Sequence, residues 1–310
     1  MNLQVSNTIL MVRPYHFTFN EETAADNAFQ ENPAELSEKD IQKKVLEEFD
    51  NMVRVLRRVG ITVLVYEEDE DKKNPDSIFP NNWISTHNDG SLITYPMFPP
   101  NRRKERNEDI IEMIEEQYRI NQRYSFEQYE DEGQFLEGTG SMVFDRQAGI
   151  VYASLSERTH IQLLDKFCLL KNYDKVAFDA TDQRGKVIYH TNVMMSVGSQ
   201  MAIVGLEAIE DRNQRKNVLR KLNQSGKSVI EITQNQIDQF AGNMLQVYSI
   251  KKDRHYMVMS ETAQKSLTAA QIKKINDFAT ILSIPIPTIE RVGGGSVRCM
   301  MAEIFLPAKK

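Results

Sequence analysis

The chain is poor in the features that mark secreted, membrane and nucleic-acid-binding proteins. It has two cysteines in 310 residues, Cys168 and Cys299, and no CxxC pair, which excludes a disulfide scaffold and fits a reduced cytoplasm. Lysine and arginine total 38 against 44 acidic residues, and the net charge of −6 argues against a nucleic-acid surface. No apolar run approaches the roughly 20 residues of a membrane helix, and residues 1–11 lack the pattern of a signal peptide. We therefore expect a cytoplasmic protein without a membrane or nucleic-acid partner.

What the chain does have is the composition of a globular protein with a large core. Its 41% hydrophobic and 26% charged residues are ordinary for such proteins. A chain of this length can bury one big core or two smaller ones. No long linker or low-complexity segment interrupts it, so we expect one domain over residues 1–310.

Strand patterns alternate with helix patterns along the whole chain. Apolar residues three and four apart predict a helix over 41–59, ended by Gly60, between strands at 9–12 and 61–65. Pairs of strands followed by helices are predicted at 83–85 with 92–95, 141–144 with 150–153, 193–197 with 201–204, and 244–250 with 256–260. A strand–strand–helix–strand unit thus recurs about five times, which predicts an α/β ring whose units cover each other's apolar faces.

The end of the chain carries the first candidate for chemistry. Cys299 follows the glycine run 293–295, whose bare backbone would let a ligand approach closely, and stands next to Arg298. A cationic neighbour favours the thiolate, which is the nucleophilic form of cysteine. The alternative is an inert, buried cysteine at the start of the last strand.

Two further segments offer partners for a nucleophilic cysteine, which needs a proton shuttle and a group that orients it. Of the five histidines, His190 lies just before an apolar strand, where a rigid element could hold a site. Glu137 is followed by Gly138 and Gly140, so its carboxylate lies on an open backbone. Taken alone, His190 could be a structural hydrogen-bonding residue and Glu137 a solvated turn residue.

Together these segments resemble the guanidine-modifying superfamily of pentein fold, which includes arginine deiminases, amidinotransferases and dimethylarginine dimethylaminohydrolases. The order of an Asp/Asn loop, Glu-Gly, His-x-Asn and a C-terminal Cys covers most of the chain. Residues 75–79, 101–105 and 155–159 look like segments of the dimethylarginine hydrolases, whereas 293–300 looks more like the arginine deiminases. The nearest likeness is to bacterial citrulline-utilisation hydrolases, through Met11-Val12-Arg13-Pro14 and the residues that follow it.

The resemblance implies a five-bladed, pseudo-symmetric α/β propeller of repeated β-β-α-β units. It also implies that Cys299 is the nucleophile, that His190 is general acid and then base, and that Glu137 orients His190. Contacts to the amino-acid part of a substrate would come from the 75–79 loop and two arginines, namely Asp76, Phe79, Arg102 and Arg158. No metal or organic cofactor is implied, and a homo-oligomer is left open.

Two asparagines decide which substrate the sequence favours. Arginine deiminases hold the guanidinium with two aspartates, and the matching positions here carry Asn82 and Asn192. A buried cation without a counter-ion is costly, whereas an amide can both donate and accept a hydrogen bond. The pair therefore favours a neutral ureido group such as that of citrulline, attacked to give an S-carbamoyl enzyme.

Two other functions stay open on the sequence. The first is an arginine deiminase or amidinotransferase that acts on a guanidine through an S-amidino intermediate, with Asp76 and Glu137 supplying the negative charge. The second is a non-catalytic pentein-fold binding protein, which would have no use for Cys299, His190 and Glu137 together.

Overall fold

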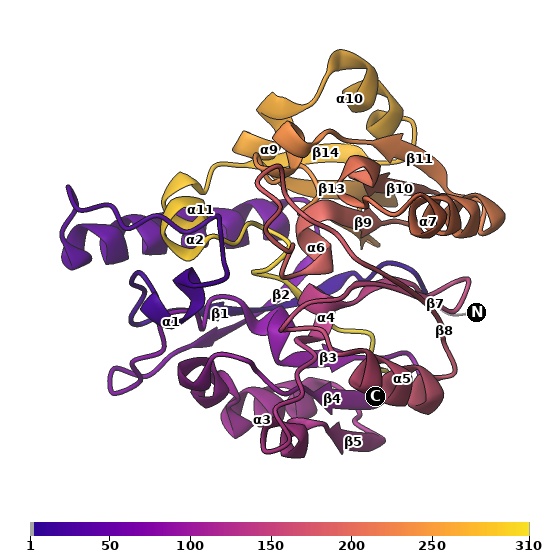
Figure 1. The fold of residues 1–310 in the computed structure, drawn as a ribbon. Helices are drawn as coiled ribbons and strands as arrows, with labels where there is room; N and C mark the ends of the chain where they lie inside the picture. Colours follow the sequence, from indigo (N-terminus) through magenta and orange to yellow (C-terminus); the bar gives the residue numbers. More distant parts are fainter. Residues whose placement is uncertain (1–2, 310) are drawn as a thin grey trace.

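The computed structural model describes residues 3–309, which form five three-stranded sheets arranged around a centre. Figure 1 shows the short helices α4 and α6 near the middle, with α2, α3, α5, α7 and α10 toward the outside.

The strands, in chain order, are β1 (Thr8–Arg13), β2 (Thr62–Glu67), β3 (Ile84–Thr86), β4 (Ser91–Thr94), β5 (Gln122–Ser125), β6 (Val143–Asp145), β7 (Ile150–Ser154), β8 (Asp174–Phe178), β9 (Met195–Val197), β10 (Met201–Val204), β11 (Ser228–Glu231), β12 (Leu245–Ser249), β13 (Arg254–Ser260), β14 (Thr280–Ile284) and β15 (Ala302–Glu303).

The α-helices are α1 (Glu21–Ala24), α2 (Glu38–Arg58), α3 (Glu108–Gln117), α4 (Gly138–Ser141), α5 (Ile161–Lys171), α6 (Thr191–Met194), α7 (Arg212–Gln224), α8 (Gln234–Ile237), α9 (Glu261–Ser266), α10 (Ala269–Asn276) and α11 (Pro287–Gly293). The 3₁₀ helices are η1 (Pro80–Asn82), η2 (Pro100–Glu105), η3 (Glu127–Glu130) and η4 (Leu206–Ala208).

All five sheets share one topology. The middle strand pairs antiparallel with one neighbour and parallel with the other, and at least one helix lies between the parallel strands in the chain. The first sheet takes its antiparallel strand from the other end of the chain, where β15 pairs with β1 through Ile9↔Glu303 and Leu10↔Ala302. The ring is therefore closed by strands from the two ends of the chain.

The helix predicted over 41–59 is present as α2. Its buried face is the predicted apolar stripe, which includes Val45, Phe49 and Met52, and the Ser37 hydroxyl caps its first turn by accepting from the Asp40 amide. Gly60 follows with a φ of 88°, a conformation that only glycine adopts readily.

Two predicted strands begin later than the sequence suggests. The strands predicted from residues 141 and 193 start at Val143 and Met195, because the residues before them form the helical turns α4 and α6. An apolar run of four or five residues does not distinguish a buried helical turn from a strand. These turns lead into β6 and β9, and η1 does the same before β3. The strand of each sheet that pairs antiparallel with the middle strand is called the inner strand below; the inner strands are β3, β6, β9, β12 and β15.

The strands β5 and β8 were missed by the sequence analysis. β5 reads Gln-Arg-Tyr-Ser and is exposed or half-exposed throughout, and β8 begins with two exposed residues. Both are short strands with exposed positions at the edge of their sheets, so their sequences give only a weak strand signal.

Gly242 provides a test of how tightly the inner turns pack. A Cβ at this position would lie 2.3 Å from the Val193 carbonyl oxygen and 2.6 Å from the Met194 carbonyl carbon, and neither backbone can yield easily. We expect Gly242→Ala to lower the free energy of unfolding by about 3 kcal/mol, measured by denaturant titration.

Gly149→Ala is the matched control for this prediction. Its φ of 67° strains any other residue, but a Cβ there meets only the Asn172 carbonyl oxygen, at 4.0 Å. The expected loss is about 1 kcal/mol. An equal or smaller loss for Gly242→Ala would contradict the close approach.

Candidate active site

The predicted site residues come from different sheets and meet where the inner strands begin. Asn82 ends η1, Glu137 precedes α4, His190 precedes α6 with Asn192 inside it, and Cys299 lies in the turn before β15. All five side chains are buried. The shared topology thus explains why residues more than 200 positions apart approach one another.

The His190 ring is bonded to the predicted carboxylate. Its Nε2 lies 2.7 Å from Glu137 Oε2, and Arg158 Nη1 lies 3.4 Å from the same oxygen. Burial by itself would raise the pKa of Glu137, but Arg158 and the bond from His190 outweigh it and lower the pKa to about 2. Burial also lowers the pKa of His190, an effect that Glu137 partly offsets. Around pH 7 the pair is therefore a carboxylate and a neutral imidazole, and the ring's Nδ1 is left for proton transfer.

Two amide groups contact the cysteine sulfur. Asn243 Nδ2 lies 3.2 Å from Cys299 Sγ and Asn192 Nδ2 lies 3.6 Å from it. Asn243 was missed by the sequence analysis. A signal exists in retrospect, since an asparagine followed by two apolar residues opens the inner strand at Asn82, Asn192 and Asn243 alike.

Arg298 lies close enough to Cys299 for their charges to interact, as its position in the sequence suggests, but its own hydrogen bond and ion pair go elsewhere. Its guanidinium donates to the Met301 carbonyl oxygen at 2.8 Å and pairs with Glu303 at 3.4 Å. Within residues 3–309, the hydrogen-bond donors to Cys299 Sγ are the two asparagine amides.

Asn82 and Asn192 each present a polar atom that no described residue satisfies. Arg102 Nη1 donates to Asn82 Oδ1 at 2.9 Å, which leaves the buried Asn82 Nδ2 without an acceptor. Asn192 Oδ1 is likewise buried and has no donor within residues 3–309. A Cβ on Gly140 would lie 2.4 Å from Asn82 Nδ2 and 2.8 Å from His190 Nδ1, so the Asn82 amide and the His190 ring both lie next to Gly140. Buried polar atoms without a partner call for an explanation, such as a catalytic role or a bound water.

The predicted residues for the amino-acid part of a substrate form a second charged group. Arg102 makes a two-pronged bond to Glu105, at 2.8 and 2.9 Å, and its Nε lies 3.8 Å from Asp76 Oδ2. Burial raises the pKa of Asp76, and Arg102 opposes this. Asp76 Oδ1 is buried and unpaired in the described part of the chain.

The glycine run does not provide the open approach expected from its sequence. A Cβ on Gly293 or Gly295 would lie 2.9 or 2.8 Å from the Phe79 ring, and Gly294 has a φ of 60° against Asn27 and Gln30. The space that missing side chains would leave is filled by Phe79 and by residues of segment 20–31. The run is needed for packing, and Phe79 supports the turn that carries Cys299.

Segment 20–31 contacts several of the predicted site residues and is called the lid below. Asn20 Nδ2 donates to Asp76 Oδ2 at 2.7 Å, and Arg158 donates to both carboxylate oxygens of Asp26, with Nε–Oδ2 at 2.6 Å. Asn27 Nδ2 lies 3.4 Å from the carbonyl oxygens of Gly293 and Gly294. The lid is thus hydrogen-bonded to the carboxylate of Asp76 and to the guanidinium of Arg158.

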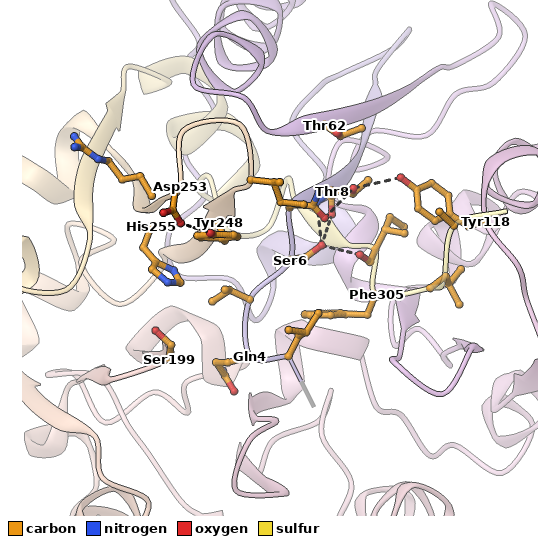
Figure 2. Close-up of a pocket in the computed structure, with 18 of the residues that line it drawn as sticks. Gln4, Ser6, Thr8, Thr62, Tyr118, Ser199, Tyr248, Asp253, His255 and Phe305 are labelled. Carbon is orange, nitrogen blue, oxygen red and sulfur yellow. Dashed lines mark hydrogen bonds between the residues drawn. The ribbon is translucent and has the colours of Figure 1, made fainter. Parts of the chain in front are cut away.

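A cavity of about 930 Å³ lies elsewhere, at the opposite ends of the inner strands. Figure 2 shows its lining, which includes Ser6, Ser199, His255 and Phe305 and none of the nine predicted site residues. Within residues 3–309 no three His, Cys, Asp or Glu side chains gather as metal ligands. No helix in the same range has the length and apolarity to cross a membrane.

Several solved structures share this arrangement of sheets. The N-terminal domain of ArgZ, an arginine dihydrolase from the ornithine–ammonia cycle in Cyanobacteria, is 16% identical with a TM-score of 0.72, covering 96% of this chain and 99% of that domain. Unliganded AgrE is 16% identical with a TM-score of 0.74, covering 98% of this chain but 40% of AgrE. A dimethylarginine dimethylaminohydrolase variant, solved as an adduct with S-methyl-L-thiocitrulline, is 14% identical with a TM-score of 0.65, covering 96% and 100%. No curated protein sequence matches the chain.

These likenesses confirm the predicted five-bladed α/β propeller of the pentein superfamily. The family model of eukaryotic N,N dimethylarginine dimethylhydrolases matches residues 13–306, so the chain belongs to that family. Membership confirms the predicted enzyme class, a hydrolase of C–N bonds other than peptide bonds.

The lid contacts lead to a prediction that does not depend on catalysis. Asp26→Asn removes the charge that fastens the lid to Arg158, and hydrogen bonds to charged groups contribute about 1.5–3 kcal/mol. We expect chymotrypsin to cleave after Phe29 roughly 10-fold faster or more, since proteolysis follows the population of the open lid.

Glu31→Gln is the control, because the ion pair of Glu31 with Arg291 is exposed. Exposed pairs contribute about 0–1 kcal/mol, so cleavage should rise by no more than roughly fivefold. Equal rates in the two variants would show that Asp26 does not hold the lid.

Proposed function

We propose that the chain, as a single catalytic domain, hydrolyses a C–N bond of a ureido or guanidino amino acid, with a citrulline-like ureido substrate preferred. The observation that carries the preference is the pair of unsatisfied amide atoms, Asn82 Nδ2 and Asn192 Oδ1. One donates and the other accepts, which suits the carbonyl oxygen and N–H groups of a neutral ureido group.

In the proposed reaction, neutral His190 takes the proton of Cys299, and Sγ attacks the ureido carbon. The developing oxyanion needs donors aimed at it, and the amide Nδ2 of Asn82 is one that has no other partner. The imidazolium, stabilised by Glu137, then protonates the leaving nitrogen. An S-carbamoyl enzyme remains, and His190 activates the water that hydrolyses it. Either nitrogen of the ureido group can leave, as ammonia or as the amine of ornithine.

The amino-acid part of the substrate would lie against the second charged group. Asp76 has a free oxygen for an α-ammonium, and Arg158 and Arg102 offer guanidinium groups for an α-carboxylate. Arg158 is engaged by Asp26 in the closed lid. A substrate carboxylate would therefore replace Asp26, which requires the lid to open when substrate enters.

A guanidine is the second candidate substrate. The structural relatives are named as acting on arginine or dimethylarginine, and the buried carboxylates of Asp76 and Glu137 could balance a cation. Hydrolysis of one guanidine nitrogen gives a ureido group, so the two candidates are successive steps of one chemistry. A non-catalytic role is disfavoured by the bonded His190–Glu137 pair, for which a binding protein has no use.

The remaining proposals rest on the sequence. The scarcity of cysteine and the acidic balance support a cytoplasmic enzyme without nucleic-acid or membrane partners. No cofactor takes part in the proposed steps, and assembly of the chain into a homo-oligomer is compatible with them.

Assays of the purified protein with citrulline and with arginine test the proposal. We expect hydrolysis of citrulline with release of ornithine and ammonia in equal amounts, whichever bond is cleaved first, because the carbamate that forms decomposes to carbon dioxide and the remaining amine, which is ammonia or ornithine. Cys299→Ala should lower kcat by roughly 10⁴-fold or more, since it removes the nucleophile. Cys168→Ala, at the other cysteine, is the control and should keep full activity.

If the protein hydrolyses arginine but not citrulline, its substrate is a guanidine and the proposed preference for a ureido group is wrong. Activity of Cys299→Ala close to that of the unaltered protein would end the cysteine mechanism altogether.

Asn192→Asp tests the substrate preference directly. A carboxylate at this position attracts a guanidinium but gains nothing from a neutral ureido group, so the ratio of kcat/KM for arginine to that for citrulline should rise by roughly 100-fold. An unchanged ratio would mean that Asn192 does not select the substrate.

A further inference from the structure

Asn243 lies just before β12, which begins at Leu245, and the residue is 1% exposed. Its Nδ2 donates to the Asn192 carbonyl oxygen at 3.1 Å and to Cys299 Sγ at 3.2 Å, and its Oδ1 accepts from the Arg298 backbone N–H at 3.1 Å. The side chain therefore links the turn of the nucleophile to the turn that carries His190 and Asn192.

The two backbone partners fix which way the amide points. If oxygen and nitrogen were exchanged, the amide NH₂ would face the Arg298 N–H and the amide oxygen would face the Asn192 carbonyl oxygen. Both contacts would be repulsive. The group that faces the sulfur is thus an N–H donor.

The turn that holds Asn243 has little freedom to move. Gly242 packs directly on the backbone of α6, and the Asn243 N–H donates to the Phe240 carbonyl oxygen at 2.9 Å. Phe240 has a φ of 60°, and its ring lies 5.3 Å from that of Phe29 in the lid. The donor is therefore held in place before the sulfur ionises.

We propose that Asn243 is the main hydrogen-bond donor to the Cys299 thiolate and positions its sulfur for attack. A hydrogen bond to the charged form favours that form, and a preorganised donor does so without a reorganisation cost. Asn192 donates over a longer distance, and Arg298 is engaged by Met301 and Glu303. The proposal deepens the proposed function, because it gives the nucleophile of that reaction its stabilising partner.

The pH dependence of cysteine alkylation tests this without any turnover. Iodoacetamide labelling of Cys299 would be followed by mass spectrometry of its peptide between pH 5 and 10, a range chosen around the ordinary thiol pKa of about 8.5. Cys168 is measured separately in its own peptide, and burial raises the pKa of its thiol to about 11. Asn243→Leu removes the donor at similar volume. Asn243→Asp keeps the acceptor for Arg298 N–H and places a negative charge near the sulfur.

We expect the midpoint of alkylation to move upward by about one pH unit in Asn243→Leu and further in Asn243→Asp. At pH values below the midpoint, one unit corresponds to a roughly 10-fold slower rate. Asn121→Asp adds the same charge at an exposed position and should leave the midpoint unchanged.

Midpoints equal to that of the unaltered protein in both Asn243 variants would overturn the proposal, even if turnover fell, because the residue would then act only in packing. If the midpoints shift but neither citrulline nor arginine is hydrolysed, the role of Asn243 stands and the proposed function fails. The two results are therefore distinguishable.

Discussion

The site depends on the closure of the ring by the last strand. β15 has only two residues paired with β1, yet it fixes the turn that carries Cys299. Side chains reinforce this short strand, since Ser6 donates to the Ile304 carbonyl oxygen at 2.6 Å. Thr86 of β3 donates to the Glu303 carbonyl oxygen at 2.9 Å and accepts from the Phe305 amide at 2.8 Å. The sulfur is thus anchored to the first and second sheets at once, while Asn243 holds it from the fifth, β12-β13-β14.

The second constraint is the cost of burying charge. Glu137, Asp76, Arg102 and Arg158 are all buried, and unpaired charges there would destabilise the fold by several kcal/mol each. Each of them has an opposite partner, and the lid contributes one through Asp26. The pairing with Arg158 helps to keep Glu137 ionised, whereas burial keeps His190 neutral by lowering its pKa against the opposing effect of Glu137. Stability and chemistry therefore use the same contacts.

The sequence predicts the parts of this arrangement that have local signals. Glu137, His190 and Cys299 stand beside glycines or an apolar strand, and their order along the chain resembles a known superfamily. The structure brings the first two into contact and lets Asn192 bridge toward the third. The helix α2 and the repeat of the unit follow from apolar periodicity, which tertiary contacts reinforce rather than override.

Other parts have no local signal and could not be predicted. Asp26 is an ordinary acidic residue in a polar segment, and its partner Arg158 is 132 positions away. Asn243 shares its local pattern with Asn82 and Asn192, but its bonds to two distant backbones are not visible in a single sequence. The glycine run was read as room for a ligand, but the Phe79 ring that fills it comes from another sheet's turn. Such features depend on which segments the closed ring places side by side.

The most direct test of the central claim is the chemical state of Cys299 during turnover. The protein would be mixed with citrulline, or with arginine, quenched in acid within milliseconds to seconds, and its peptides analysed by mass spectrometry. The account predicts a covalent adduct on the Cys299 peptide and none on the Cys168 peptide, lost again as substrate is exhausted. With citrulline, the adduct is a carbamoyl group if the ornithine amine leaves first, and a carbamoyl group that still carries ornithine if ammonia leaves first. Arginine gives the corresponding amidino adducts. Steady product formation with an unmodified Cys299 at every time point would contradict the account.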